Sequence, residues 1–418
     1  MTTSPGIGSE LRDALLAFGR PAYQPTAGFA WLDGAGRPTP QIPQHTYVTC
    51  RMTYVWSLEL MSSNLDNEEA RAKAEHGIRL LSQYFRDRVH GGWFASMEAG
   101  SNTGNPVPHD VTKACYPHAF VVLAAATAAQ AEVRGALSLL DDALEVLFGR
   151  FWDEASGMFV EDYSRDFTSL SEYRGLNSAM HAVEALLAAW DLLRSERELT
   201  ALVRIVTRVL DLAEEWGCRL PEHFSPTWDV LQDYNVDNPR HPTRPYGSTP
   251  GHWCEWARLL LHTRAALIES GSGDELLISR CVSTAQALFD RAWADAWEVD
   301  GAPGMVFTVD FAGTPIVHTR LHWVACEAVG AAQTLSSVNP TSANVARAQT
   351  LWQFIVDHHV DPAGGWFHEL DGSLRPSSQI RKGKADLYHA YQATLLPELP
   401  VTPSLASGLR TRLVSGLD

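Results

Sequence analysis

Cysteine is scarce in this chain and follows no disulfide or metal-binding pattern. The six cysteines are scattered between positions 50 and 326, and none belongs to a Cys-x-x-Cys pair. So few cysteines in a long chain argue against a disulfide scaffold and against a cysteine zinc site. The pattern favours a reducing compartment, and we expect a cytoplasmic protein.

Positive charge and long hydrophobic runs are also lacking. Lys and Arg number 33 against 49 Asp and Glu, which gives a net charge of −16 and a pI near 5.4. Nucleic acids and anionic membrane surfaces are polyanions, so neither is an expected partner. The longest near-apolar run, 119–129, is far shorter than the ~20 residues that a membrane span needs. The first residues have no basic region before an apolar core, so we expect no signal peptide.

Glycine-rich phosphate loops and nucleophile elbows are absent from the sequence. Gly-x-Gly occurs at 6–8, 34–36 and 271–273, but none of these continues to a third glycine in a dinucleotide fingerprint. No Gly-x-Ser-x-Gly motif is present. The sequence therefore predicts a protein without a nucleotide cofactor.

Apolar residues instead recur with the period of an α-helix along most of the chain. Predicted helices span 8–19, 46–63, 68–88, 113–131, 135–150, 174–193, 196–216, 250–270, 274–294, 319–336, 341–359, 384–396 and 404–415. From residue 46 they form pairs with short joints, and longer stretches between pairs repeat a glycine followed by a bulky apolar residue. This period predicts an all-α fold, an (α/α)6 barrel of six helical hairpins, with residues 1–418 as one catalytic domain. An open helical solenoid is the alternative, although its repeats are usually shorter and more alike.

Polar side chains recur in or near the first half of the first helix of each pair. They are Arg51; Tyr116 with His118; Asn177 with His181 and Glu184; His252 with Glu255; His322 with Glu327; and His389. If the first helices form an inner ring, these groups meet at one end, where helix N-termini favour a developing oxyanion. His252 and Glu255 stand at i and i+3, so we expect the carboxylate to fix the tautomer of the imidazole. Imidazoles titrate near neutrality and suit proton transfer beside a carbonyl.

Structural and metal-binding interpretations compete with this one. A lone buried histidine is more often a hydrogen-bonded core residue, Glu184 suits a buried partner of His181, and Arg51 suits an ion-pair donor. Histidine and carboxylate at i, i+3 also ligate metal in di-iron bundles. Here histidine precedes glutamate, the reverse of the usual motif, so we expect no metal.

Tryptophan is abundant, with 14 residues against 7 methionines. Trp253, Trp256 and Trp323 flank the polar groups, whereas Trp93 and Trp366 follow glycines at the repeated turns. Flat apolar faces beside polar groups suit a sugar ring, although tryptophan also fills large interiors. We expect stacking on a monosaccharide among the first three and packing for the other two.

Six segments together resemble the N-acylglucosamine 2-epimerase superfamily, and within it the branch of mannose and sulfoquinovose isomerases. They extend over nearly the whole chain: CRMT at 50–53, KACYPHAF at 113–120, NSAMHAVEA at 177–185, PGHWCEWARLL at 250–260, HWVACEA at 322–328 and GKADLYHAYQA at 383–393. The resemblance implies an (α/α)6 barrel and a cofactor-independent interconversion of aldose and ketose, D-mannose and D-fructose, through a cis-enediol.

The resemblance also implies roles for individual residues. His252 and His389 look like the catalytic acid/base pair, and Glu255 looks like the catalytic partner that orients His252. Positions that resemble substrate-binding residues are Arg51, Tyr116, Asn177, His181, Trp323 and Glu327. A sugar 2-epimerase uses the same two histidines and stays an alternative, as does a non-catalytic sugar-binding barrel. A homo-oligomer is left open, because sequence alone does not separate an exposed helical patch from a buried one.

Overall fold

The computed structural model describes residues 5–272 and 274–415, and the fold is all-α with short strands between helices. The chain divides into two compact units. Unit 1 comprises residues up to Phe18, Val206–Lys384 and His389–Thr402; unit 2 comprises Gly19–Ile205, Ala385–Tyr388 and the residues from Pro403. The prediction of one domain over residues 1–418 stays a prediction. No helix in the described ranges is both long enough and apolar enough to span a membrane.

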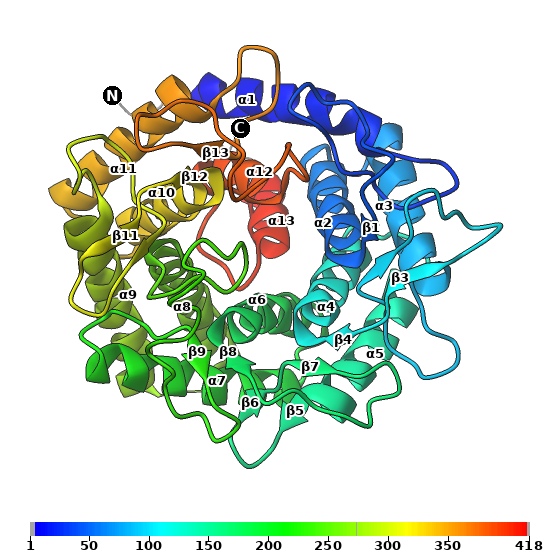
Figure 1. The fold of residues 1–418 in the computed structure, drawn as a ribbon, viewed down its shortest axis with the longest axis horizontal. Coiled ribbons are helices and arrows are strands. Elements are labelled where there is room, and N and C mark those ends of the chain that lie inside the picture. Colours follow the sequence, from blue (N-terminus) through cyan, green and yellow to red (C-terminus); the bar gives the residue numbers. More distant parts are fainter. Residues whose placement is uncertain (1–4, 273, 416–418) are drawn as a thin grey trace. The chain divides into compact units, whose positions relative to one another are not determined.

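Unit 2 is built from helical hairpins. Its helices are α2 (Thr46–Ser62), α3 (Glu68–Gln83), α4 (Cys115–Gln130), α5 (Ala136–Val146), α6 (Leu176–Leu193) and α13 (Leu405–Ser415). The helix α2 packs on α3 and α4, and α4 packs on α5 and α6 (Figure 1). Nearly every side chain of α4 is buried, whereas α3 buries one face only. Helices that are apolar all round are therefore interior, and amphipathic ones cover them.

Unit 1 follows the same plan. Its helices are α1 (Pro5–Gly19), α8 (Pro250–Ser270), α9 (Glu275–Ala296), α10 (His322–Val338), α11 (Ser342–Phe354) and most of α12 (Tyr388–Leu395), while α7 (Glu196–Glu215) continues from unit 2. The helix α8 packs on α9 and α10, and α10 packs on α11 (Figure 1). Capping defines the starts of the outer helices, because the Asp274 side chain accepts from Leu277 N at 2.9 Å and Thr341 from Asn344 N at 3.1 Å.

Short strands lie in the long connections. In unit 2 they are β1 (Gln44–His45), β2 (Ser96–Met97), β3 (Pro108–Asp110), β4 (Lys113–Ala114), β5 (Trp152–Asp153), β6 (Met158–Phe159), β7 (Asp162–Tyr163) and β8 (Arg174–Gly175). In unit 1 they are β9 (His223–Phe224), β10 (Thr308–Val309), β11 (Pro315–Val317), β12 (Arg320–Leu321) and β13 (Glu369–Leu370). Antiparallel pairs include β4 with β7 and β12 with β13, in which Arg320 lies opposite Leu370. These pairs fix the chain immediately before an inner helix begins.

Several helix boundaries differ from the sequence prediction. The helices predicted from 113, 174 and 319 begin at Cys115, Leu176 and His322, because the residues before them pair as strands. The helix predicted from 384 begins at Tyr388. Those predicted to end at 150 and 359 finish in π-helical turns, η2 (Leu147–Phe151) and η3 (Ile355–His359). Short 3₁₀ turns, η1 (Arg20–Ala22) and η4 (Leu396–Glu398), complete the helical elements.

The repeated glycines have the conformation that the sequence predicts. Gly304 has φ +90°, and a Cβ placed on it would lie 2.3 Å from the Phe354 ring. The turn therefore needs glycine both for its backbone angle and for its close approach to the ring. The six cysteines are all free thiols, and five of them are buried.

Candidate active site

His252 stands in the first turn of α8 and is held by a carboxylate from a preceding loop. Its Nδ1–H donates to both oxygens of Glu222, at 2.9 and 3.0 Å. The exposed fractions of the two side chains are 12% and 5%. Because the carboxylate accepts from Nδ1, the proton-accepting nitrogen of the neutral ring is Nε2. The imidazole is therefore mostly shielded from solvent and held in one orientation by its carboxylate.

His389 forms a second pair of the same kind with one addition. Its Nδ1–H donates to Glu327 Oε1 at 2.8 Å, and the other oxygen of Glu327 accepts from Arg258 Nε at 2.9 Å. All three side chains are almost completely buried. The carboxylate again fixes the tautomer, so that Nε2 is the nitrogen that can exchange a proton.

Trp323 connects the two histidines within unit 1. The centroid of its ring lies 5.0 Å from that of His252 and 6.0 Å from that of His389. Its exposed fraction is 7%, and its indole nitrogen makes no hydrogen bond with any described residue. The structure thus brings together three of the residues predicted from sequence.

A stacked pair of imidazoles lies beside His389. His322 and His368 are parallel to within 10°, with ring centroids 3.8 Å apart, and the His322 ring is 6.3 Å from that of His389. Burial lowers the pKa of His322 well below its usual value, and the neighbouring His368 and His389 add to this effect. The stacked His322 is therefore neutral at physiological pH.

The expected pairing of Glu255 with His252 is corrected by the structure. The carboxylate that accepts from His252 is that of Glu222, 30 residues earlier in the chain. Glu255 is buried beside a different group, with Oε1 3.8 Å from Arg258 Nη2. The i, i+3 spacing puts both residues on one face of α8, but the first-turn imidazole turns toward the loop before β9. Glu327, expected to bind substrate, is the carboxylate that orients His389.

One group in unit 1 has the spacing of a metal site. Glu255, Glu327 and His389 each offer a ligand atom within 4.8 Å of the others. Both oxygens of Glu327, however, already accept hydrogen bonds, and one of these comes from the permanently charged guanidinium of Arg258. A cation bound here would be repelled by that guanidinium, so the donor set suits an organised proton relay better than a metal.

Unit 2 holds a buried guanidinium on α2. Arg51 donates to the Tyr116 hydroxyl at 2.8 Å and to Asp386 at 3.2 Å. Burial alone would lower the pKa of Arg51, but Tyr116 and Asp386 raise it above its usual value. Its Nε is buried and makes no hydrogen bond within the described part of the chain. Arg51 is therefore a fixed positive charge with a donor that a ligand oxygen can use.

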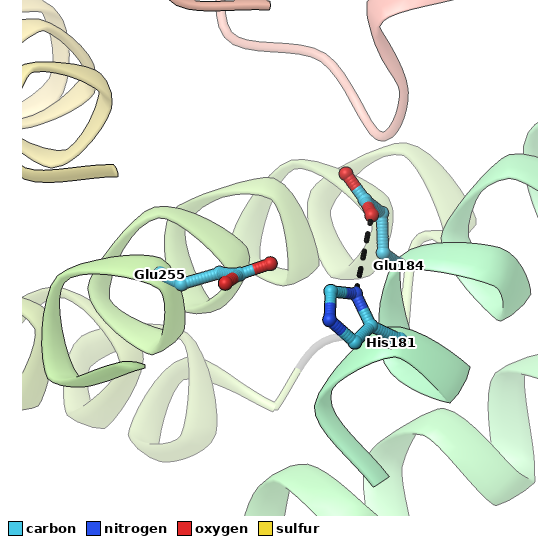
Figure 2. A group of neighbouring side chains, drawn as sticks. All are labelled: His181, Glu184 and Glu255. Atoms are coloured by element: carbon cyan, nitrogen blue, oxygen red, sulfur yellow. Dashed lines mark ion pairs between the residues drawn. The ribbon is translucent and has the colours of Figure 1, made fainter. Parts of the chain in front are cut away.

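His181, Glu184 and Asn177 lie on α6. His181 Nδ1 is 3.9 Å from Glu184 Oε2, and Figure 2 shows the two side chains projecting from neighbouring turns of that helix. The same figure shows Glu255 projecting from α8. Glu184 also accepts a hydrogen bond from the Tyr388 hydroxyl. The Asn177 side-chain oxygen is buried and has no hydrogen-bond partner among the described residues.

Several aromatic and histidine candidates prove to be structural. Trp253 and Trp256 have exposed fractions of 0% and 1%, so the expectation of sugar stacking is wrong for both. Trp253 donates to the Ser248 hydroxyl at 2.8 Å. His118 accepts from Trp93 N at 3.1 Å, and burial lowers its pKa to about 3. Trp93 is buried at its turn, as the sequence predicts.

Three residues that contact the predicted site residues were not predicted from the sequence: Glu222, Arg258 and Asp386. Glu222 stands in a loop with no helical period, so nothing in its surroundings marks it as a partner of His252. The sequence signal for Arg258 was its place on the α8 face that carries Glu255, one turn later. Asp386 falls within one of the segments that carry the family resemblance, close to His389.

Fold and site together define an all-α protein of helical hairpins in which carboxylates orient the imidazoles of His252 and His389. The chain belongs to the N-acylglucosamine 2-epimerase family, whose sequence profile matches residues 27–393.

Individual proteins of known activity are also similar to this chain over nearly its whole length. The chain is similar to the D-mannose isomerase of Thermobifida fusca, 42% identical over 400 residues and 95% of both chains. It is 40% identical over 395 residues to that of Pseudomonas cannabina pv. alisalensis, covering 94% of this chain and 91% of the relative. A crystal structure of D-mannose isomerase matches with a TM-score of 0.83 at 25% identity, over 94% of this chain and 97% of the other. This likeness confirms the predicted class of helical-barrel fold.

Proposed function

We propose that this protein is a sugar isomerase that interconverts D-mannose and D-fructose by histidine acid/base catalysis. The observation that carries the proposal is the placement of His252 and His389 beside Trp323, each with a carboxylate on Nδ1. The identity of 42% with a D-mannose isomerase over nearly the whole chain supports the choice of reaction.

The reaction needs only proton transfers. In the open-chain aldose, Nε2 of one histidine takes the proton from C2, and the C–H electrons form the C1–C2 double bond. The carbonyl oxygen at C1 takes a proton, which gives the cis-enediol. The hydroxyl at C2 then loses its proton as C1 gains one, which leaves the ketose. C1 is reduced and C2 oxidised within one molecule, so the overall balance requires no external oxidant or reductant.

The two histidines suit this sequence because both present the same nitrogen. Each ring can accept a proton at Nε2 and become an imidazolium stabilised by its carboxylate. Glu222 and Glu327 hold the two rings in one orientation through these hydrogen bonds. Trp323 supplies a flat apolar face beside both, which suits the C–H face of a sugar.

The polar residues of unit 2 are proposed to bind substrate oxygens. Arg51 and Asn177 offer a donor and an acceptor that have no partner in the described chain, and Tyr116 and His181 accompany them. A cytoplasmic location and a homo-oligomeric state stay predictions.

Incubation with D-mannose in D2O, followed by NMR, tests the proposal. We expect fructose with deuterium at C1, at the same rate with and without a chelator. Glucose with deuterium at C2 would instead identify a 2-epimerase. Absence of exchange with any hexose would overturn both reactions and favour a sugar-binding protein, and loss of activity in chelator would establish a metal requirement. A His389→Gln variant is the matched control for contaminating isomerase.

A further inference from the structure

Arg258 is a buried charge between two carboxylates. It lies on α8, six residues after His252, and its side chain is 2% exposed. Its Nε donates to Glu327 Oε2 at 2.9 Å, and its Nη2 lies 3.8 Å from Glu255 Oε1. Its guanidinium is the cation that accompanies both acidic groups.

The guanidinium favours the ionised form of the two carboxylates that it accompanies. Ligand atoms of Glu255, Glu327 and His389 lie within 4.8 Å of one another. Two buried carboxylates at such a distance raise the pKa of one member until it holds a proton. A guanidinium, which remains charged at any physiological pH, reverses that tendency at the oxygen it contacts.

The protonation state of Glu327 decides what His389 can do. As a carboxylate, Glu327 accepts from His389 Nδ1–H and leaves Nε2 as the reactive nitrogen. A protonated Glu327 can instead donate to Nδ1, which moves the imidazole proton to Nε2 and removes the base. The charge and the orientation of Glu327 are therefore both needed for the relay.

We propose that Arg258 is a positioning residue of the isomerase reaction, which keeps Glu327 ionised and directed at His389. The inference rests on the proposed function, in which His389 exchanges protons with the sugar. The pair of His252 and Glu222 provides a contrast, because Glu222 forms no ion pair with lysine or arginine among the described residues. Loss of Arg258 should therefore impair one of the two histidines and spare the other.

Several titratable and charged groups of α8 and α10 surround the relay. The titratable and charged groups around Glu327 and His389 are Cys254, Glu255 and Arg258 from α8 and His322 and Cys326 from α10. Burial raises the pKa of both thiols and lowers that of His322, so these three groups are neutral. Arg258 therefore places a positive charge beside both Glu327 and Glu255.

Arg258→Met tests the inference through the pH profile of kcat. Without the cation the pKa of Glu327 rises, so the acidic limb of the profile should move to higher pH. We expect kcat to fall by about 10- to 100-fold with little change in KM, as for loss of a charge-assisted hydrogen bond. Arg12→Met is the matched control, because Arg12 is a buried arginine of unit 1 that pairs with Glu398 at 2.9 Å. It should change stability without moving the limb.

A double variant separates positioning from general stability. If Arg258 acts through Glu327, Arg258→Met should cost nothing further in a Glu327→Gln background. The inference would be overturned if the losses of kcat in the two single variants multiplied in the double variant. It would also be overturned if the acidic limb of the pH profile did not move in Arg258→Met. If Arg258→Met does not fold, Arg258→Lys decides: it keeps the charge but not the geometry, so the limb should stay in place while kcat falls. A wild-type kcat in that variant would overturn the inference. Failure of the proposed function is distinct, because the wild-type protein would then show no exchange.

Discussion

The imidazole–carboxylate pairs of the two units differ in the distance between nitrogen and oxygen. In unit 1, His252 and His389 contact their carboxylates at 2.9 and 2.8 Å, and each partner comes from another element of the fold. In unit 2, His181 and Glu184 are neighbours on one helix and lie 3.9 Å apart. The pairs that make good hydrogen bonds are those far apart in sequence. Helical spacing brings two side chains to one face of a helix. In the two pairs that make short hydrogen bonds, however, the carboxylate comes from a loop or from a second helix.

The proposed function assigns proton transfer to His252 and His389. The strongest test replaces each histidine of unit 1 in turn. His252→Gln and His389→Gln should each lower kcat by about 10²- to 10⁴-fold, the usual contribution of a general acid or base. Deuterium incorporation measured by NMR reports the loss, and circular dichroism confirms folding. His181→Gln is the companion variant: if it lowers kcat as much with KM unchanged, the division between the units is wrong.

We expect a smaller loss of kcat when Glu222, the hydrogen-bond partner of His252, is replaced. Glu222→Gln keeps the shape of the side chain but removes the charge that stabilises the imidazolium, so kcat should fall by about 10- to 100-fold. In a His252→Gln background the same change should have no further effect on kcat. Independent losses in the double variant would show that Glu222 acts elsewhere.

The guanidinium of unit 2 should affect binding more than turnover. Arg51→Met removes a donor proposed for substrate oxygens, so KM for mannose should rise by about tenfold or more while kcat changes less. Steady-state kinetics measures both constants. Arg51 also donates to Tyr116 and Asp386, so Asp386→Asn is the control that loosens Arg51 without removing it. A loss confined to kcat in Arg51→Met would contradict the assignment.

The smallest expected effect is on the pH dependence of stability. It arises from one buried histidine in each unit. Burial lowers the pKa of His118 in unit 2 to about 3 and that of His359 in unit 1 to about 4, against 6.5 in the unfolded chain. Below pH 6.5 both histidines become protonated in the unfolded chain but stay neutral in the folded protein. The free energy of unfolding therefore falls as the pH decreases. Each histidine should contribute about 2 kcal/mol to this fall between pH 6.5 and 5.

Urea unfolding at a series of pH values measures the effect. His118→Gln and His359→Gln should each flatten the dependence of the unfolding free energy on pH in that interval. An unchanged slope in both variants would show that these rings titrate normally in the folded protein.

Much of the fold could be predicted because its signals are local. The helical period predicted the bounds of α2, α8 and α9 to within two residues, although α3 ends at Gln83 and not at 88. The glycine turns follow from backbone angles that other residues rarely adopt. Helix starts were misplaced where residues such as Lys113 and Arg320 pair as strands, since that pairing depends on a distant segment. Trp253 and Trp323 have similar surroundings in sequence, yet only Trp323 retains some exposure beside the histidines.

The sequence by itself determined the class of fold and the family, because helical period and short motifs are properties of neighbouring residues. Only the tertiary structure decided which carboxylate serves which imidazole. Glu222 reaches His252 across 30 residues and Glu327 reaches His389 across 62. A hydrogen bond depends on distances of a few tenths of an ångström between atoms, and these are fixed only when the helices have packed.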